Sequence, residues 1–183
     1  MKNTAIFHGT GCSPNSYWLP WLKSELEKKG YQVWVPSLPE PDKPDLKNWL
    51  PFVMKNGVFS EETILIGHSA GCPLILSILE NIKVKVKQTI LVAGFSESLK
   101  AIDKKPIFQE SYDWDKIKQH ANEFIFINSD NDPCGCNDKA GRKLREHLEG
   151  KLIICKGQGH FGSDTYKQPY KEFPLVLELI IKP

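Results

Sequence analysis

The sequence has no uninterrupted apolar run of membrane-spanning length. The uncharged stretch at 63–79 comes nearest, but it is divided by a histidine, a serine, two glycines and Pro73, whereas a spanning helix needs about 20 mainly apolar residues. The apolar stretch near the N-terminus is too short for the core of a signal peptide, and a glycine loop follows it in place of a cleavage site. We therefore expect a cytoplasmic protein with no membrane partner.

A basic block is also lacking. The chain has 24 Lys and Arg against 22 Asp and Glu, a formal net charge of +2, and these charges are interspersed along it. Nucleic-acid-binding surfaces gather basic residues on one face or along one helix. We therefore expect no nucleic-acid partner.

Cysteine is too sparse, and odd in number, for a disulfide framework. The five cysteines favour a reducing compartment. Cys134, Cys136, Cys155 and His160 could in principle ligate zinc, but their spacing matches no common structural zinc site. We therefore expect neither a metal nor a cofactor.

What is present is an alternation of strand-like and helix-like segments. The 183 residues are 40% hydrophobic and 25% charged, which is ordinary for one domain spanning 1–183. Strands are predicted at 5–7, 31–36, 63–67, 88–94, 123–128 and 152–155, and helices at 16–29, 45–55, 71–79, 113–120, 138–148 and 170–181. Near-continuous apolar strands between helices predict a mainly parallel, six-stranded sheet in a three-layer αβα sandwich. Residues 95–121, which we expect over the carboxyl ends of the strands, leave little room for a lid.

The segment 63–79 reads as a strand, a tight turn and a helix, with Gly67-His68-Ser69-Ala70-Gly71 at the turn. This pattern is typical of a nucleophile elbow, where the serine hydroxyl stands above the sheet edge. The two glycines would leave room for the close approach of helix and strand. The alternative is a turn whose serine only caps the helix.

Functional side chains follow the predicted strands in the order Ser69, Asp132, His160, which is the order of an α/β hydrolase. Ser69 would be the nucleophile, His160 its base, and Asp132 the group that orients the imidazole. Asp130 is the rival carboxylate; Asp132 is favoured because Pro133 forces an extended turn.

The oxyanion and acyl sites are predicted from neighbouring residues. The backbone amides of Ala70 and Thr10 could stabilise the oxyanion. Trp18, Trp114 and Phe161 could line a shallow acyl pocket, or could equally pack in the core.

Several stretches together carry a family resemblance: His8-Gly9, Trp18-Leu19-Pro20-Trp21-Leu22, Val35-Pro36-Ser37-Leu38-Pro39, Gly67-His68-Ser69-Ala70-Gly71, Asp132-Pro133 and Gly159-His160-Phe161. They resemble the small serine hydrolases related to retinoblastoma-binding protein 9 and their bacterial relatives. The resemblance implies a nearly lidless α/β hydrolase with Ser69, Asp132 and His160 as its triad. The chain lacks the Leu-x-Cys-x-Glu motif, so the retinoblastoma partner is not carried over. It also has Cys134-Gly135-Cys136 where an aliphatic residue and proline often follow the Asp-Pro.

We therefore expect an esterase-like serine hydrolase that cleaves a small ester, thioester or amide through an acyl-enzyme on Ser69. The substrate would be a small acyl compound. A catalytically idle scaffold that binds protein, and an acyltransferase, remain open alternatives, and the sequence does not indicate an oligomeric state.

Overall fold

One six-stranded sheet forms the centre of the molecule. The computed structural model describes residues 1–99 and 106–182. The strands are β1 (Asn3–Phe7), β2 (Gln32–Trp34), β3 (Thr63–His68), β4 (Gln88–Val92), β5 (Phe124–Ser129) and β6 (Lys151–Cys155). Their order is β2-β1-β3-β4-β5-β6, and all neighbouring pairs are parallel. The predicted α/β architecture is confirmed.

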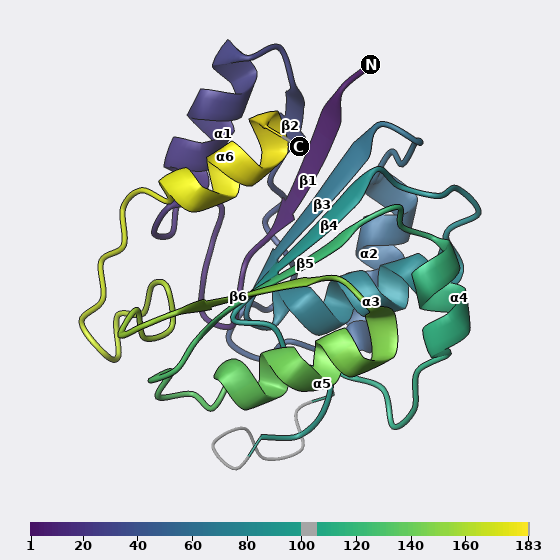
Figure 1. The fold of residues 1–183 in the computed structure, drawn as a ribbon. Helices are drawn as coiled ribbons and strands as arrows, with labels where there is room; N and C mark the ends of the chain where they lie inside the picture. The colour runs from purple at the N-terminus through teal and green to yellow at the C-terminus, as the bar shows by residue number, and fades with distance from the viewer. Residues whose placement is uncertain (100–105, 183) are drawn as a thin grey trace.

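Helices cover both faces of this sheet (Figure 1). The helix α1 (Leu19–Lys28) packs beside α6 (Pro174–Ile181) on one face. The other face carries α2 (Leu46–Asn56), α3 (Gly71–Asn81), α4 (Trp114–Gln119) and α5 (Asp138–Leu148), which contact one another in that order. This is the three-layer sandwich that the alternation of elements predicts.

Burial explains why the central segments read as continuous apolar runs. Every residue of β3 is buried, and so is α3 from Gly71 to Leu79. The edge strands β2 and β6 contain no fully buried residue. A strand with helices on both faces has no solvent-facing side to alternate with its core side.

The strand order reverses between β1 and β3. From β1 the chain crosses to β2 on one side, and after β3 it proceeds through β4, β5 and β6 on the other. The loops that leave β1 and β3 therefore diverge at the carboxyl edge of the sheet, which is where open α/β sheets bind their ligands.

Two helices begin later than their periodicity predicts, at Leu19 in place of residue 16 and at Pro174 in place of residue 170. The reason is the same in both. A helix begun at Ser16 or Tyr170 would place Pro20 or Pro174 at its fifth position, where the missing N–H would leave the carbonyl four residues earlier without its helical hydrogen bond. Each proline instead lies in the first turn, where no such donor is needed.

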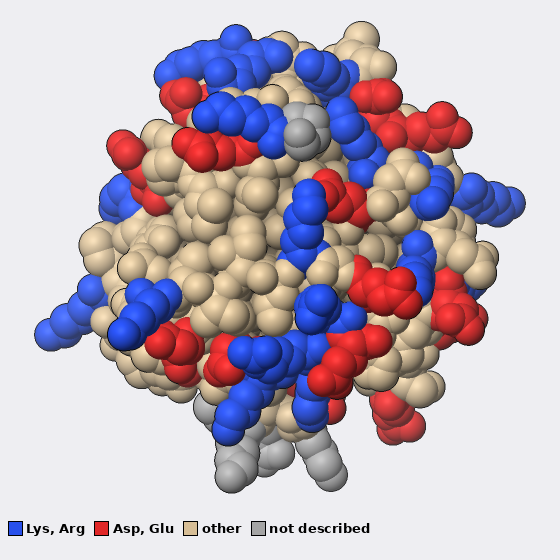
Figure 2. Space-filling view, viewed as in Figure 1, with Lys and Arg blue, Asp and Glu red and all other residues tan. Residues whose placement is uncertain are grey.

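Surface charge and helix length agree with the composition. Figure 2 shows Lys and Arg side chains intermixed with Asp and Glu across the visible face. Within the described residues, no helix is both long and apolar enough to cross a membrane. Part of the predicted 95–121 segment, residues 100–105, lies outside the described residues; residue 99 lies against the loop after β5, where a Cβ on Gly135 would be 3.6 Å from Leu99 Cβ.

Candidate active site

Ser69 lies in a sharp turn between β3 and α3. Its φ is +52°, a left-handed conformation that is costly for a residue with a Cβ. A Cβ on Gly71 would lie 2.3 Å from the carbonyl oxygen of Phe7, and one on Gly67 would lie 2.8 Å from the backbone of Gly71. Only glycine fits at either place, so the turn has the strained, closely packed geometry of a nucleophile elbow.

His160 and Asp132 meet at the same edge of the sheet. The Nδ1 of His160 lies 2.7 Å from Oδ2 of Asp132, and both side chains are buried. The second oxygen of Asp132 accepts the backbone N–H of Cys134 at 2.7 Å. Asp130 is exposed, and its carboxylate accepts the N–H of Gly157 at 2.7 Å. The structure therefore places Asp132, and not Asp130, on the imidazole.

The carboxylate changes the protonation of the imidazole. Burial alone would lower the pKa of His160, but hydrogen bonds to Asp132 and Cys134 and the negative charge of the Asp132 carboxylate raise that pKa from 6.5 to about 9. The Asp132 carboxylate thus favours the imidazolium, the form that a general base adopts once it has taken a proton.

The backbone of His160 is held at both of its polar groups. Its N–H donates to Oε1 of Gln168 at 2.9 Å, and its carbonyl oxygen lies 2.8 Å from Nε2 of His68. Gln168 pairs with Ser163 through two backbone hydrogen bonds of 3.0 and 2.7 Å, which close a tight loop. A Cβ on Gly159 would lie 1.8 Å from the Gln168 amide nitrogen. The glycine before His160 therefore makes room for this contact.

Gln168 was not predicted as a site residue. The only sequence signal for it is indirect: glycines before and after His160-Phe161 indicate that other groups approach closely there. No pattern in the sequence indicates which side chain fills the space.

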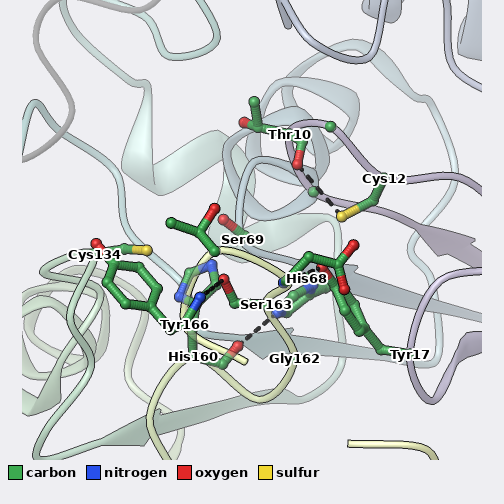
Figure 3. Close-up of a pocket in the computed structure, with 14 residues that line it drawn as sticks. Thr10, Cys12, Tyr17, His68, Ser69, Cys134, His160, Gly162, Ser163 and Tyr166 are labelled. Atoms are coloured by element: carbon green, nitrogen blue, oxygen red, sulfur yellow. Dashed lines mark hydrogen bonds between the residues drawn. The ribbon is translucent and has the colours of Figure 1, made fainter. Parts of the chain in front are cut away.

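A cavity of about 330 Å³ opens beside Ser69. In Figure 3, Ser69 and His160 lie between Cys134 on one side and Tyr17 on the other. The lining is mostly polar and consists of Gly9, Thr10, Gly11, Cys12, Tyr17, His68, Ser69, Cys134, His160, Gly162, Ser163, Asp164, Thr165 and Tyr166. Its size and position suit a small ligand.

The three aromatic residues considered for an acyl pocket do not line this cavity. Trp18 and Phe161 are fully buried, and the Trp18 indole N–H donates to the Phe161 carbonyl at 2.9 Å. Trp114 opens α4, where its ring stacks on His147 with centroids 4.1 Å apart. Tyr17 and Tyr166 supply the aromatic lining instead.

The glycine loop after β1 reaches Ser69, as its position in the sequence predicts. A Cβ on Gly9 would lie 3.0 Å from Ser69 Cβ. His8 orients this loop: its Nδ1 lies 2.9 Å from the Gly9 carbonyl, and its Nε2 accepts the N–H of Leu38 at 3.2 Å. Thr10 follows in the same loop and lines the cavity, while Ala70 lies at the N-terminal end of α3.

Comparison with known proteins identifies the family. A sequence model of the serine hydrolases matches residues 4–180. The chain belongs to the serine hydrolase family. This serine hydrolase is 32% identical to the hydrolase YdeN of Bacillus subtilis over 184 residues, which cover 98% of this chain and 94% of YdeN. It is 27% identical to the serine hydrolase RBBP9 of Rattus norvegicus over 164 residues, 88% of this chain and 87% of that one. The resemblance seen in the motifs is confirmed.

Solved structures confirm the fold of this serine hydrolase. The crystal structure of the B. subtilis ydeN product superposes with a TM-score of 0.90 at 30% identity, over 98% of this chain and 97% of that one. An extracellular α/β-hydrolase from a Paenibacillus species reaches 0.64 at 15% identity, over 100% and 98% of the two chains. The fold is that of the α/β hydrolases.

Three side chains of the serine hydrolase site are of metal-ligating type. Asp132, Cys134 and His160 each offer one ligand atom, and these atoms lie within 4.8 Å of one another. The grouping differs from the zinc alternative considered on the sequence, because it includes a carboxylate and omits Cys136 and Cys155.

Proposed function

We propose that this serine hydrolase is esterase-like and cleaves a small ester, thioester or amide through an acyl-enzyme on Ser69. The observation that carries the proposal is the 2.7 Å hydrogen bond between His160 and Asp132 at the edge of the cavity that Ser69 lines. A serine, a histidine and a carboxylate in this arrangement form the triad that activates an alcohol for attack on a carbonyl.

The first half of the reaction acylates the enzyme. Because Nδ1 of His160 is bonded to Asp132, the Nε2 of the same ring is the position that accepts a proton. Ser69 Oγ attacks the substrate carbonyl carbon while its proton passes to His160 Nε2. The imidazolium then gives this proton to the leaving alcohol, thiol or amine as the carbonyl–leaving-group bond breaks.

The second half releases the acid. Water attacks the acyl carbon and gives a proton to His160, which returns it to Ser69 Oγ as the acyl–serine bond breaks. Asp132 keeps the imidazole in one orientation and stabilises its charged form without taking the proton itself. The raised pKa of His160 is the equilibrium expression of that stabilisation.

Backbone amides supply the oxyanion site in this proposal. Ala70 is the N-cap residue of α3, a helix of 11 residues, so its amide lies at the positive end of the helix dipole. Thr10 lies on the glycine loop that packs against Ser69 from the β1 side. Hydrogen-bond donors on two sides of the attacked carbonyl would stabilise the negative charge that develops on its oxygen in the transition state.

A fluorophosphonate probe tests the proposal against a catalytically idle scaffold. We expect stoichiometric labelling of the wild type, loss of labelling in Ser69→Ala, and retained labelling in Ser163→Ala, a serine that lines the same cavity. A folded wild type that stays unlabelled would leave the scaffold as the better explanation. Product analysis with and without an added alcohol then separates hydrolysis from acyl transfer, since both pass through the same acyl-enzyme.

A further inference from the structure

Cys134 places a thiol beside the base and its carboxylate. Its half-buried side chain lines the same cavity as Ser69, and in Figure 3 its sulfur points toward Ser69 and His160. The Asp132 and His160 side chains are buried, and their ligand atoms and the Cys134 sulfur lie within 4.8 Å of one another. The Cys134 thiol and the His160 imidazole thus line the cavity, and the buried Asp132 carboxylate lies within 4.8 Å of both.

We propose that Asp132, Cys134 and His160 form a binding site for a zinc-type divalent cation, and that the bound cation inhibits the enzyme. The inhibition rests on the proposed function, because it requires His160 to act as the base. The binding of the cation does not depend on that function.

The donor set suits zinc. Thiolate sulfur, imidazole nitrogen and carboxylate oxygen are the three ligand types that Zn²⁺ takes in proteins, at about 2.0–2.3 Å, so tetrahedral ligand atoms stand about 3.3–3.8 Å apart. With Nδ1 as the ligand, the Asp132–His160 pair, hydrogen-bonded at 2.7 Å, must open by about 0.6 Å or more to reach that spacing. Ligand atoms at the 4.8 Å limit must approach one another by about 1.0–1.5 Å. The cavity leaves the fourth position open to water, as in zinc sites with three protein ligands.

Coordination and catalysis exclude each other at this site. A ring nitrogen of His160 that binds the cation, or an Asp132 oxygen drawn away from Nδ1, removes the base that takes the proton of Ser69. The thiol of Cys134 releases its proton to solvent when the sulfur binds, because thiolate is the ligand form. Removing the cation with a chelator reverses the step, since the thiolate then takes a proton back from solvent.

Cys12 provides a matched control. It lines the same cavity, but its sulfur lies 3.3 Å from the Thr10 carbonyl and it is outside the three-residue group. A general effect of cavity thiols on metal ions would involve both cysteines. A site built on Asp132 and His160 involves Cys134 alone.

The test uses Co²⁺ as a spectroscopic probe and Zn²⁺ as the inhibitor. We expect Co²⁺ to give a thiolate-to-cobalt charge-transfer band with the wild type and with Cys12→Ser. Cys134→Ser should lack the band. Zn²⁺ should displace Co²⁺ and should slow fluorophosphonate labelling of the wild type and Cys12→Ser, with EDTA restoring the rate. For Cys134→Ser, the Zn²⁺ concentration needed should rise at least about tenfold.

Each failure has a separate meaning. Absence of the cobalt band in the wild type, or an equal band in Cys134→Ser, overturns the site. A normal band with no effect of Zn²⁺ on labelling overturns the inhibition. A protein that shows the band but is never labelled by the probe overturns the proposed function and leaves the metal site standing.

Discussion

The Nε2 of His68 lies 2.8 Å from the backbone carbonyl oxygen of His160, and the two rings lie 5.1 Å apart. A carbonyl only accepts hydrogen bonds, so Nε2 of His68 carries the hydrogen. Burial, the neighbouring His160 and the nearby His8 lower the pKa of His68 to about 3, despite the hydrogen bond to His160. His68, the residue before Ser69, is therefore a neutral donor that joins the turn after β3 to the loop that carries His160.

Replacing this donor should weaken both stability and turnover. In His68→Leu the His160 carbonyl loses its buried partner, which we expect to lower the free energy of unfolding by about 1–3 kcal/mol and kcat by about tenfold. His68→Gln retains an N–H donor and should lose less of each. Urea unfolding and ester kinetics on the two variants measure this, and equal losses in both would contradict a role for the hydrogen bond.

The two carboxylates after β5 should differ sharply. Asp132→Asn puts an amide on His160 Nδ1 and should lower kcat by about 10⁴-fold with the fold intact. Asp130→Asn should cost far less, because Asp130 is exposed and bonds only the Gly157 amide among its described contacts. Circular dichroism checks the fold of each variant. A larger loss in Asp130→Asn would move the orienting role to that residue.

A glycine at position 69 should give a more stable fold than a residue with a Cβ. Ser69→Gly and Ser69→Ala both remove the hydroxyl, and both should be inactive. Only glycine adopts the φ of +52° without a steric penalty from a Cβ. We therefore expect the free energy of unfolding of Ser69→Gly to exceed that of Ser69→Ala by about 1 kcal/mol. Thermal unfolding compares the pair directly. Equal stability would show that the left-handed turn stores no strain at this position.

Much of the fold could be predicted from particular segments. The predicted strand at 63–67 has an uninterrupted apolar centre, Ile64-Leu65-Ile66, because every residue of β3 is buried. The sequence also indicates where α1 and α6 begin, because Pro20 and Pro174 lack the N–H group that a residue inside a helix donates. Apolar periodicity alone extended both helices too far.

The sequence predicted which three candidate side chains lie at one edge of the sheet, but not what surrounds them. Ser69, Asp132 and His160 converge because each follows a parallel strand whose carboxyl end lies at one sheet edge. Gln168 lies in an irregular loop, and its approach to His160 depends on tertiary packing. Trp18 entered the core because the Phe161 carbonyl satisfies its indole N–H, a partner that 143 residues of separation hide from the sequence.

The pH dependence of the reaction should follow the imidazole. Only neutral His160 can take the proton of Ser69, so kcat/KM should rise with pH through a midpoint above the ordinary 6.5, toward about 9. The same shift stabilises the fold fully below pH 6.5, and that contribution is lost as pH rises through about 9, because the folded state holds the proton more tightly.

Asp132→Asn provides the control for this assignment, because it removes the charge that favours the imidazolium. Its remaining activity should titrate with a lower midpoint than that of the wild type. A pH–rate profile of kcat/KM on a neutral ester measures both. A wild-type midpoint at or below 6.5 would contradict the assignment.

Acyl-chain preference should follow the size of the cavity. At about 330 Å³ the cavity lies near the lower end of the range of about 300–1,000 Å³ for ligand pockets. Its lining includes the half-exposed Tyr166 and two further polar residues, Ser163 and Asp164. Each buried CH₂ contributes about 0.8 kcal/mol, or about fourfold in kcat/KM, until the chain reaches solvent.

We therefore expect kcat/KM for p-nitrophenyl esters to rise over the shortest acyl chains and to plateau or fall by about eight carbons, because further methylenes stay in water. Measuring kcat/KM for the series from acetate to decanoate tests this expectation. Repeating the series below and above the critical micelle concentration of a detergent controls for interfacial activation. A steady increase to the longest ester would mean that the acyl chain binds along a deep channel, one that the polar lining beside Ser69 does not provide.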